Sequence, residues 1–116
     1  MNTVEIPSVS FGGHRVICLT IGLQGSGKST WARKLAASEP NRWRLINRDD
    51  LRLMLWDGPF NGRKSDEKIV TEITDTAVRS ALAAGQDVIL HNTFMNAGDR
   101  KAIHKIAEEV GNCSVV

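Results

Sequence analysis

Hydrophobic residues along the chain fall into two kinds of pattern, short continuous runs and longer stripes at helical spacing. The continuous runs predict strands at Arg15–Ile21, Trp43–Ile46, Asp87–Leu90 and Asn112–Val116. Continuous apolar runs are typical of strands in a sheet that is covered on both faces. We expect the third strand to end near His91.

Helical patterns occupy the segments between these runs. Trp31, Leu35 and Ala36 follow a glycine-rich loop at helical spacing, and a proline stops that helix. Directly after the second strand, NRDDLRLMLW at residues 47–56 predicts a short helix. The Gly and Pro content of residues 57–64 then predicts a loop.

Two longer helices follow, each with a predicted cap. Ser65 is predicted to cap the third helix, and Asp66 and Glu67 are placed to interact favourably with its dipole. Its apolar stripe, which ends at Gly85, comprises Ile69, Val70, Ile73, Ala77, Val78, Ala81 and Leu82. Asn96 is predicted to cap the fourth helix. The inward-facing residues of that helix, which is closed by Gly111, are Ile103, Ile106, Ala107 and Val110.

Strands that alternate with helices imply βαβ units, and such units build a parallel sheet with helices on both faces. The chain of 116 residues is long enough for one domain and too short for two. We therefore predict one α/β domain over residues 14–116, built as a three-layer sandwich. Residues 1–13 show no sustained period and are predicted to form an N-terminal leader.

The composition excludes several classes of protein. Hydrophobic residues make up 41% and charged residues 24%, which is ordinary for a globular domain, and the net charge of +2 only weakly favours an anionic partner. Cys18 and Cys113 form no metal-binding or disulfide pattern, and no apolar run is long enough to span a bilayer. Because there is no signal-peptide pattern either, we expect a soluble cytoplasmic domain with no membrane partner.

The segment GLQGSGKST, residues 22–30, lies between the first strand and the first helix and matches GxxxxGK[ST] with an additional glycine. Glycines allow backbone N–H groups to turn inward around phosphate oxygens, and the following helix directs its positive end at the same anion. A flexible turn that binds nothing would not explain a lysine and a hydroxyl at these offsets. The residues predicted to bind ATP and Mg²⁺ are Gly22, Gly25, Ser26, Gly27, Lys28, Ser29 and Thr30, with Ser29 as the metal ligand.

A second polar segment, INRDDLR at residues 46–52, follows the second strand. Ligands of parallel α/β sheets gather beyond the carboxyl ends of the strands, where the glycine loop also lies. An aspartate there can accept a proton from an acceptor hydroxyl, and Arg52 could neutralise phosphate charge. In the alternative interpretation, Asp49 or Asp50 only caps the short helix and Arg52 pairs with it at the surface. We expect Asp49 to be the base and Asp50 the structural residue.

Basic residues concentrate around this segment, where they are compatible with a short track for a phosphodiester backbone. They are Arg42, Arg44, Arg48, Arg52, Arg63 and Lys64. Aspartates among them dilute the positive charge.

Three segments, in this order and spacing, resemble the 5′-kinase domain of bacteriophage polynucleotide kinases and related RNA-repair kinases. They are LTIGLQGSGKSTWARKL, INRDDLR and VILHNT, and the resemblance runs from about Arg15 to the C-terminus. The glycine loop alone is widespread, whereas KSTWAR followed by NRDDxR is much more specific. The resemblance implies a P-loop kinase fold with a parallel sheet of order 2-3-1-4. It also implies ATP-dependent phosphorylation of the 5′-hydroxyl end of DNA or RNA.

By this resemblance, the lysine and serine of the glycine loop would contact the ATP phosphates and Mg²⁺. Asp49 would be the general base on the 5′-hydroxyl, and Arg52 would hold phosphate on the acceptor side. Thr93 matches a residue that touches the acceptor backbone, and Asn92 stands where the family commonly has an aspartate. An amide at this place can orient Thr93 by a hydrogen bond but brings no charge.

The resembling family continues beyond the fourth strand into a lid helix whose arginines contact the transferring phosphate, and this sequence stops at Val116. We therefore expect a domain that ends before the lid, binds Mg·ATP, and transfers phosphate slowly unless another chain supplies an arginine. The fourth strand would be an open sheet edge, which invites pairing into a homo-oligomer. Two other functions fit the same residues: a kinase for a nucleoside, nucleotide or sugar, and a nucleotide-binding module without turnover.

Overall fold

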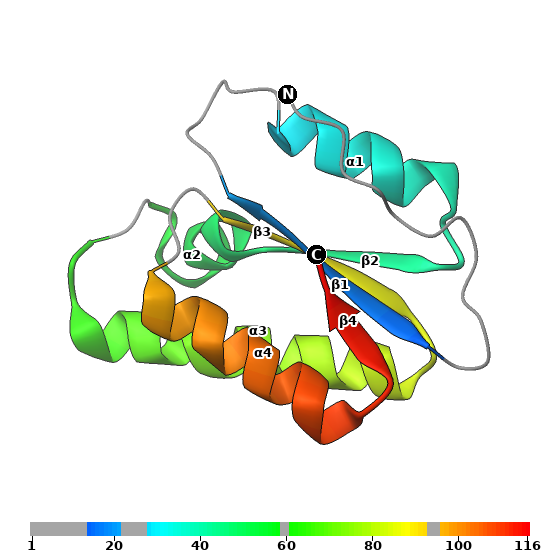
Figure 1. Cartoon of the computed structure of the whole chain (residues 1–116). Coiled ribbons are helices and arrows are strands. Elements are labelled where there is room, and N and C mark those ends of the chain that lie inside the picture. Colours follow the sequence, from blue (N-terminus) through cyan, green and yellow to red (C-terminus); the bar gives the residue numbers. More distant parts are fainter. Residues whose placement is uncertain (1–13, 22–27, 59–60, 93–95) are drawn as a thin grey trace.

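One parallel sheet forms the centre of the molecule (Figure 1). The computed structural model describes residues 14–21, 28–58, 61–92 and 96–116. The strands of this part are β1 (Arg15–Ile21), β2 (Trp43–Asn47), β3 (Asp87–Asn92) and β4 (Cys113–Val115). All neighbouring pairs are parallel and the order is β2-β3-β1-β4, which confirms the predicted sheet. The predicted leader lies outside the described residues.

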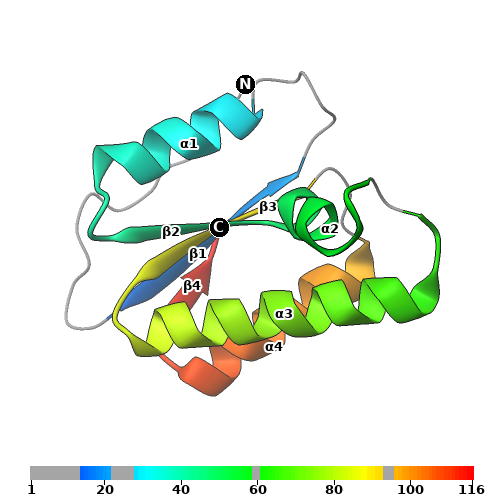
Figure 2. The ribbon, with the colours of Figure 1, turned by 180° about the vertical axis from the view of Figure 1, so that it is seen from behind.

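Helices cover both faces of the sheet (Figure 1, Figure 2). They are α1 (Lys28–Ser38), α2 (Arg48–Trp56), α3 (Lys64–Ala83) and α4 (Ala97–Val110). α1 lies on one face, α3 and α4 lie on the other, and α2 lies beside the carboxyl ends of the strands. This arrangement is the predicted three-layer sandwich. No helix among the described residues has the length and apolar character needed to cross a membrane.

The hydrophobic core is divided by the sheet into two layers, because successive side chains of a strand point to opposite faces. On the α1 face, the buried cluster consists of Val16, Cys18, Ala32, Trp43 and Ile89. On the opposite face, it consists of Ile17, Val78, Ala81, Leu82, Val88, Leu90, Ile103, Ile106 and Ala107. β3 lies between β1 and β2, and all of its residues are buried.

The start of α3 differs from the sequence prediction. Arg63 occupies the N-cap position without a capping side chain, so the predicted cap at Ser65 is wrong. The Asn61 side chain accepts the backbone N–H of Arg63 at 2.9 Å, and the resulting turn starts the helix before Ser65. The predicted cap of α4 is confirmed, because Asn96 and Asp99 form a reciprocal capping box.

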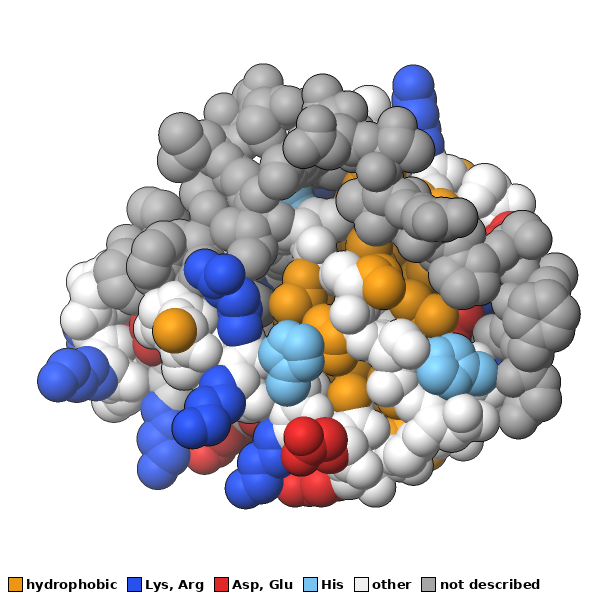
Figure 3. Space-filling view, viewed as in Figure 1, with side chains coloured by type: hydrophobic (Ala, Val, Ile, Leu, Met, Phe, Trp, Pro, Cys, Tyr) orange, Lys and Arg blue, Asp and Glu red, His pale blue; other side chains and the backbone are white. Residues whose placement is uncertain are grey.

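β4 lies at an edge of the sheet and pairs only with β1 among the described strands. Figure 3 shows the side on which β4 and α4 face the viewer, with hydrophobic side chains visible near the centre. Lys and Arg side chains gather at the lower left of this view. The pairing of two chains along this open edge stays a prediction.

A buried ion pair joins the strands at the end where β3 begins. Asp87 is fully buried, its Oδ2 accepts a 2.7 Å hydrogen bond from Arg42 Nε, and its Oδ1 accepts the N–H of Val16 at 2.9 Å. Arg42 also pairs with Glu39 at 2.8 Å and lies over the Trp43 ring, 4.4 Å from its centroid. Arg42 therefore stabilises the fold, and it lies at the opposite end of β2 from the INRDDLR segment.

Replacing Asp87 with asparagine is expected to lower the free energy of unfolding by about 3–5 kcal/mol, because Arg42 would keep a buried charge without this carboxylate. The surface pair of Arg79 and Glu109, with side chains 46% and 43% exposed, supplies the control. Glu109→Gln should change the free energy of unfolding by less than about 1 kcal/mol. Urea unfolding measures both variants, and equal effects would contradict the structural role of Asp87.

Candidate functional site

The carboxyl ends of β1, β2 and β3 lie at the same end of the sheet because the three strands are parallel. The glycine loop follows β1, and its residues 22–27 lie outside the described residues, as does Thr93. α1 begins at Lys28, and its first turn contains no acidic residue. Free N–H groups give a helix N-terminus a partial positive charge, so this end of α1 suits an anion.

Asp49 lies at the start of α2, where β2 ends. Asn47 caps this helix, since its Oδ1 accepts the N–H of Asp49 at 2.9 Å and that of Asp50 at 3.4 Å. The cap that the sequence suggested at Asp49 or Asp50 is therefore wrong, because Asn47 already performs it. The Asp49 side chain is 38% exposed, so a solute can reach it.

Arg52 connects two carboxylates and has a side chain that is only 6% exposed. Its Nη1 donates to Asp49 Oδ1 at 2.7 Å. Arg52 lies about one helical turn after Asp49 on α2, so the two side chains share a face of the helix. Its Nε and Nη2 donate to Oε2 and Oε1 of Glu67, both at 2.8 Å. The alternative interpretation placed the pair of Arg52 with Asp49 at the surface, but the arginine side chain is buried and also pairs with Glu67 on α3.

Asn92 connects these residues to the end of β1. It is the last residue of β3, it is 1% exposed, and its Oδ1 lies 3.4 Å from Arg52 Nη1. In the sheet register, Asn92 pairs with Ile21, the residue immediately before the loop. The structure therefore brings Asp49, Arg52 and Asn92 together beside the end of β1.

A second arginine adjoins this group. Arg48 is 5% exposed, its Nη2 donates to Thr71 Oγ1 at 3.2 Å, and the same nitrogen lies 3.7 Å from Glu67 Oε1. We call Arg48, Asp49, Arg52 and Glu67 the arginine–carboxylate cluster, in which two positive and two negative formal charges cancel.

The charges of the cluster influence one another. Hydrogen bonding to Glu67 raises the pKa of Arg52, and the same hydrogen bonds lower the pKa of Glu67. Burial lowers the pKa of Arg48. Arg52 and Glu67 therefore hold each other in their charged forms.

The lowered pKa of Glu67 makes the stability of the domain depend on pH. In the unfolded chain, this carboxyl has its ordinary pKa of about 4.3, so the unfolded state takes up a proton first as the pH falls. The stabilisation is present above that value and is lost as the pH falls through the lowered pKa of the folded state. Urea unfolding from about pH 6 to pH 3 should show this loss as a fall in the free energy of unfolding. The free energy of unfolding should fall less steeply with pH in Glu67→Gln than in the wild-type chain. Identical slopes would contradict the ion pair.

From the sequence, Glu67 is predicted only to be a favourable charge at the start of a helix. The structure shows that it lies in line with Val70 and Thr74, which are fully buried on the inner face of α3. A carboxylate that continues a buried stripe needs a cationic partner, and this signal could have identified Glu67. The identity of that partner, Arg52, depends on how α2 packs against α3.

His91 is also buried at this end of the sheet. Its Nδ1 lies 2.6 Å from Thr20 Oγ1, and the two residues are register partners on β3 and β1. This hydrogen bond satisfies both polar groups inside the sheet, which supports a structural interpretation. Among the described residues, no group of three or more His, Cys, Asp and Glu side chains is arranged to hold a metal ion.

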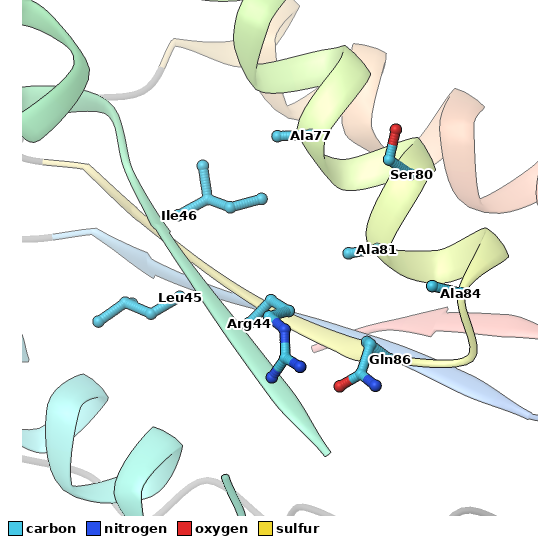
Figure 4. A pocket seen from close by; sticks show the side chains of 8 residues that line it. All are labelled: Arg44, Leu45, Ile46, Ala77, Ser80, Ala81, Ala84 and Gln86. Atoms are coloured by element: carbon cyan, nitrogen blue, oxygen red, sulfur yellow. The ribbon is translucent and has the colours of Figure 1, made fainter. Parts of the chain in front are cut away.

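A pocket of about 450 Å³ lies between β2 and α3 (Figure 4). Ile46 lines it from the strand, Ala77 and Ala81 line it from the helix, and Arg44 and Gln86 lie at one end. Among the described residues that line it, Arg44 is the single charged residue, and none belongs to the arginine–carboxylate cluster. The described lining contains no acidic side chain and no histidine, whereas the arginine–carboxylate cluster contains the partly exposed carboxylate of Asp49.

The chain belongs to the AAA domain family, which matches residues 17–116. A curated protein of Autographa californica nuclear polyhedrosis virus, named as a bifunctional polynucleotide kinase/RNA ligase, is 26% identical over 108 residues. This match covers 83% of the chain and 15% of the viral protein.

Two solved structures share the fold. A chain of the Pnkp1/Rnl/Hen1 complex is 27% identical with a TM-score of 0.74, covering 89% of this chain and 35% of that chain. A chain of the Pnkp1/Rnl/Hen1 RNA repair complex is 27% identical with a TM-score of 0.71. The match covers 89% of this chain and 32% of that chain. The chain thus spans between 15% and 35% of the length of these relatives. They confirm the fold and the resemblance to polynucleotide kinases.

Proposed function

We propose that this chain is a polynucleotide 5′-kinase domain, which transfers the γ-phosphoryl group of ATP to the 5′-hydroxyl end of DNA or RNA. One observation carries the proposal: Arg52 contacts both Asp49 and Asn92, and Asn92 pairs with the residue before the glycine loop. This arrangement holds a carboxylate next to the end of the strand from which the loop leaves. The viral relative named as a polynucleotide kinase supports the substrate class.

The residues expected to hold Mg·ATP fit an anionic ligand. α1 directly follows the glycine loop in the sequence, a helix N-terminus favours an anion, and no acid in the first turn of α1 opposes a phosphate. Lys28 would contact the β- and γ-phosphates, and the Ser29 hydroxyl would ligate Mg²⁺. ATP supplies the phosphoryl group, and Mg²⁺ neutralises charge on the phosphates.

Asp49 is the proposed general base. Its carboxylate accepts the proton of the 5′-hydroxyl while the 5′ oxygen bonds to the γ-phosphorus and the bond to the bridging oxygen of ADP breaks. Arg52 orients this carboxylate through the 2.7 Å hydrogen bond and is proposed to hold acceptor phosphate. Asn92 and Thr93 are proposed to contact the acceptor backbone.

A transfer assay with γ-labelled ATP and Mg²⁺ tests the proposal with three acceptors: a 5′-hydroxyl oligonucleotide, a nucleoside, and water alone. We expect label on the oligonucleotide. Label on the nucleoside but not on the oligonucleotide would indicate a small-acceptor kinase. Bound ATP without any transfer would indicate a nucleotide-binding module.

A further inference from the structure

The contact between Arg52 and Glu67 is a bidentate ion pair that joins two helices. Two nitrogens of the guanidinium donate to the two oxygens of the carboxylate, each over 2.8 Å. A planar guanidinium held at two points cannot rotate about its own axis without breaking both hydrogen bonds. The plane of Arg52, which belongs to α2, is therefore set by a residue of α3.

The fixed plane determines the direction of the third nitrogen. Nη1 lies 2.7 Å from Asp49 Oδ1 and 3.4 Å from Asn92 Oδ1. Glu67 thus influences the proposed base through Arg52, although it lies on a different helix from Asp49.

Burial makes this arrangement depend on Glu67. The side chains of Arg52 and Glu67 are 6% and 20% exposed, so water has little access to replace a lost hydrogen bond. Without the Glu67 charge, Asp49 would be the strongest acceptor left to Arg52 within the cluster. Because guanidinium groups favour two parallel bonds to one carboxylate, Arg52 would turn and draw the Asp49 oxygens out of their present orientation.

We propose that Glu67 is a positioning residue for phosphoryl transfer, which holds Arg52 so that Arg52 orients the Asp49 carboxylate. The inference rests on the proposed function, because it assumes that Asp49 acts in transfer. It assigns to Glu67 no contact with ATP or with the acceptor.

Glu67→Gln tests the proposal. Glutamine keeps the size of the side chain, but its amide nitrogen cannot accept a hydrogen bond from a guanidinium, so the pair loses its charge and one bond. We expect kcat to fall by about 10- to 100-fold, the effect of a misplaced reacting group, while the Kd for Mg·ATP is unchanged. Glu72→Gln is the matched control, because Glu72 is exposed on the same helix and should leave kcat unchanged. Equal kcat values for the two variants would overturn the proposal.

A double-variant comparison separates positioning from a merely structural effect. Lysine cannot form the bidentate pair, so Glu67→Gln should change kcat little in an Arg52→Lys background. If Glu67→Gln lowers kcat by the same factor in both backgrounds, Glu67 does not act through Arg52 and the proposal is wrong.

If Glu67→Gln does not fold, Glu67→Asp is tested instead. Aspartate keeps the negative charge, but its shorter side chain does not extend as far toward Arg52. Unchanged kcat in folded Glu67→Asp would overturn the proposal.

Nuclear magnetic resonance reports the ion pair without relying on activity. The Nε–H proton of Arg52 should exchange slowly with water in the wild-type chain, and its signal is assigned by its absence from Arg52→Lys. In Glu67→Gln this signal should shift or disappear, and an unchanged signal would contradict the ion pair. If the signal responds as expected but the wild-type chain phosphorylates no polynucleotide, then the proposed function is wrong and the ion pair stands.

Discussion

Lys28→Ala is expected to abolish phosphoryl transfer and to leave the domain folded. Lys28 is the first residue of α1 and directly follows the glycine loop. In the GxxxxGK[ST] pattern, this lysine contacts the β- and γ-phosphates, where negative charge must be neutralised during transfer. The expected role is a contact with the nucleotide and not packing, so the free energy of unfolding without ATP should change little. Steady-state transfer and urea unfolding measure the two effects.

Lys34→Ala is the matched control for this experiment. Lys34 is exposed on the same helix, and its replacement removes the same charge and the same side chain. It should keep the wild-type rate of transfer. A folded Lys28→Ala protein that transfers phosphate as fast as the Lys34→Ala protein would falsify the assignment of the phosphate loop.

Asp49→Asn is expected to lower the turnover number by about 10²–10⁴-fold, the range for loss of a proton-transfer group. Asparagine keeps an oxygen that can accept the hydrogen bond from Arg52 Nη1, so the cluster should keep its arrangement. It cannot accept the proton of the acceptor hydroxyl. The affinity for Mg·ATP, measured by titration calorimetry, should change little because the nucleotide is expected at the glycine loop.

Asp50→Asn makes the same change one residue later on α2. Asp50 is exposed, and the role of helix cap belongs to Asn47. The Asp50 variant should therefore retain most of its turnover. If it lost more activity than the Asp49 variant, the general base would have been assigned to the wrong aspartate.

The fold was largely predictable from the sequence because the signals that determine it are local. Continuous apolar runs identified every strand that the structure describes, and apolar stripes identified the helices between them. The errors lie at the ends of elements. β3 ends at Asn92, one residue beyond the predicted end near His91, because these two polar residues find partners on β1 and α2. The sequence does not show such partners.

The site was predictable only in part, for a similar reason. The placement of Asp49 and Arg52 near the end of β1 followed from the rule that ligands gather at the carboxyl ends of parallel strands. Asn92 was identified only through the resemblance to the 5′-kinase family. The bidentate pair of Arg52 with Glu67 did not follow, because it depends on the packing of α2 against α3. The same limit explains why Arg42 was grouped with the acceptor-side arginines, although it pairs with the buried Asp87.

The central claim is that this domain phosphorylates a 5′-hydroxyl end, and the fate of the label tests it most directly. The chain is incubated with γ-labelled ATP and Mg²⁺ in the presence of one of two oligonucleotides. The two have the same sequence, and one ends in a 5′-hydroxyl and the other in a 5′-phosphate. We expect label only on the first, and digestion to mononucleotides should recover all of it on the 5′-terminal nucleotide. Equal labelling of both oligonucleotides, or label at internal or 3′ positions, would contradict the claim.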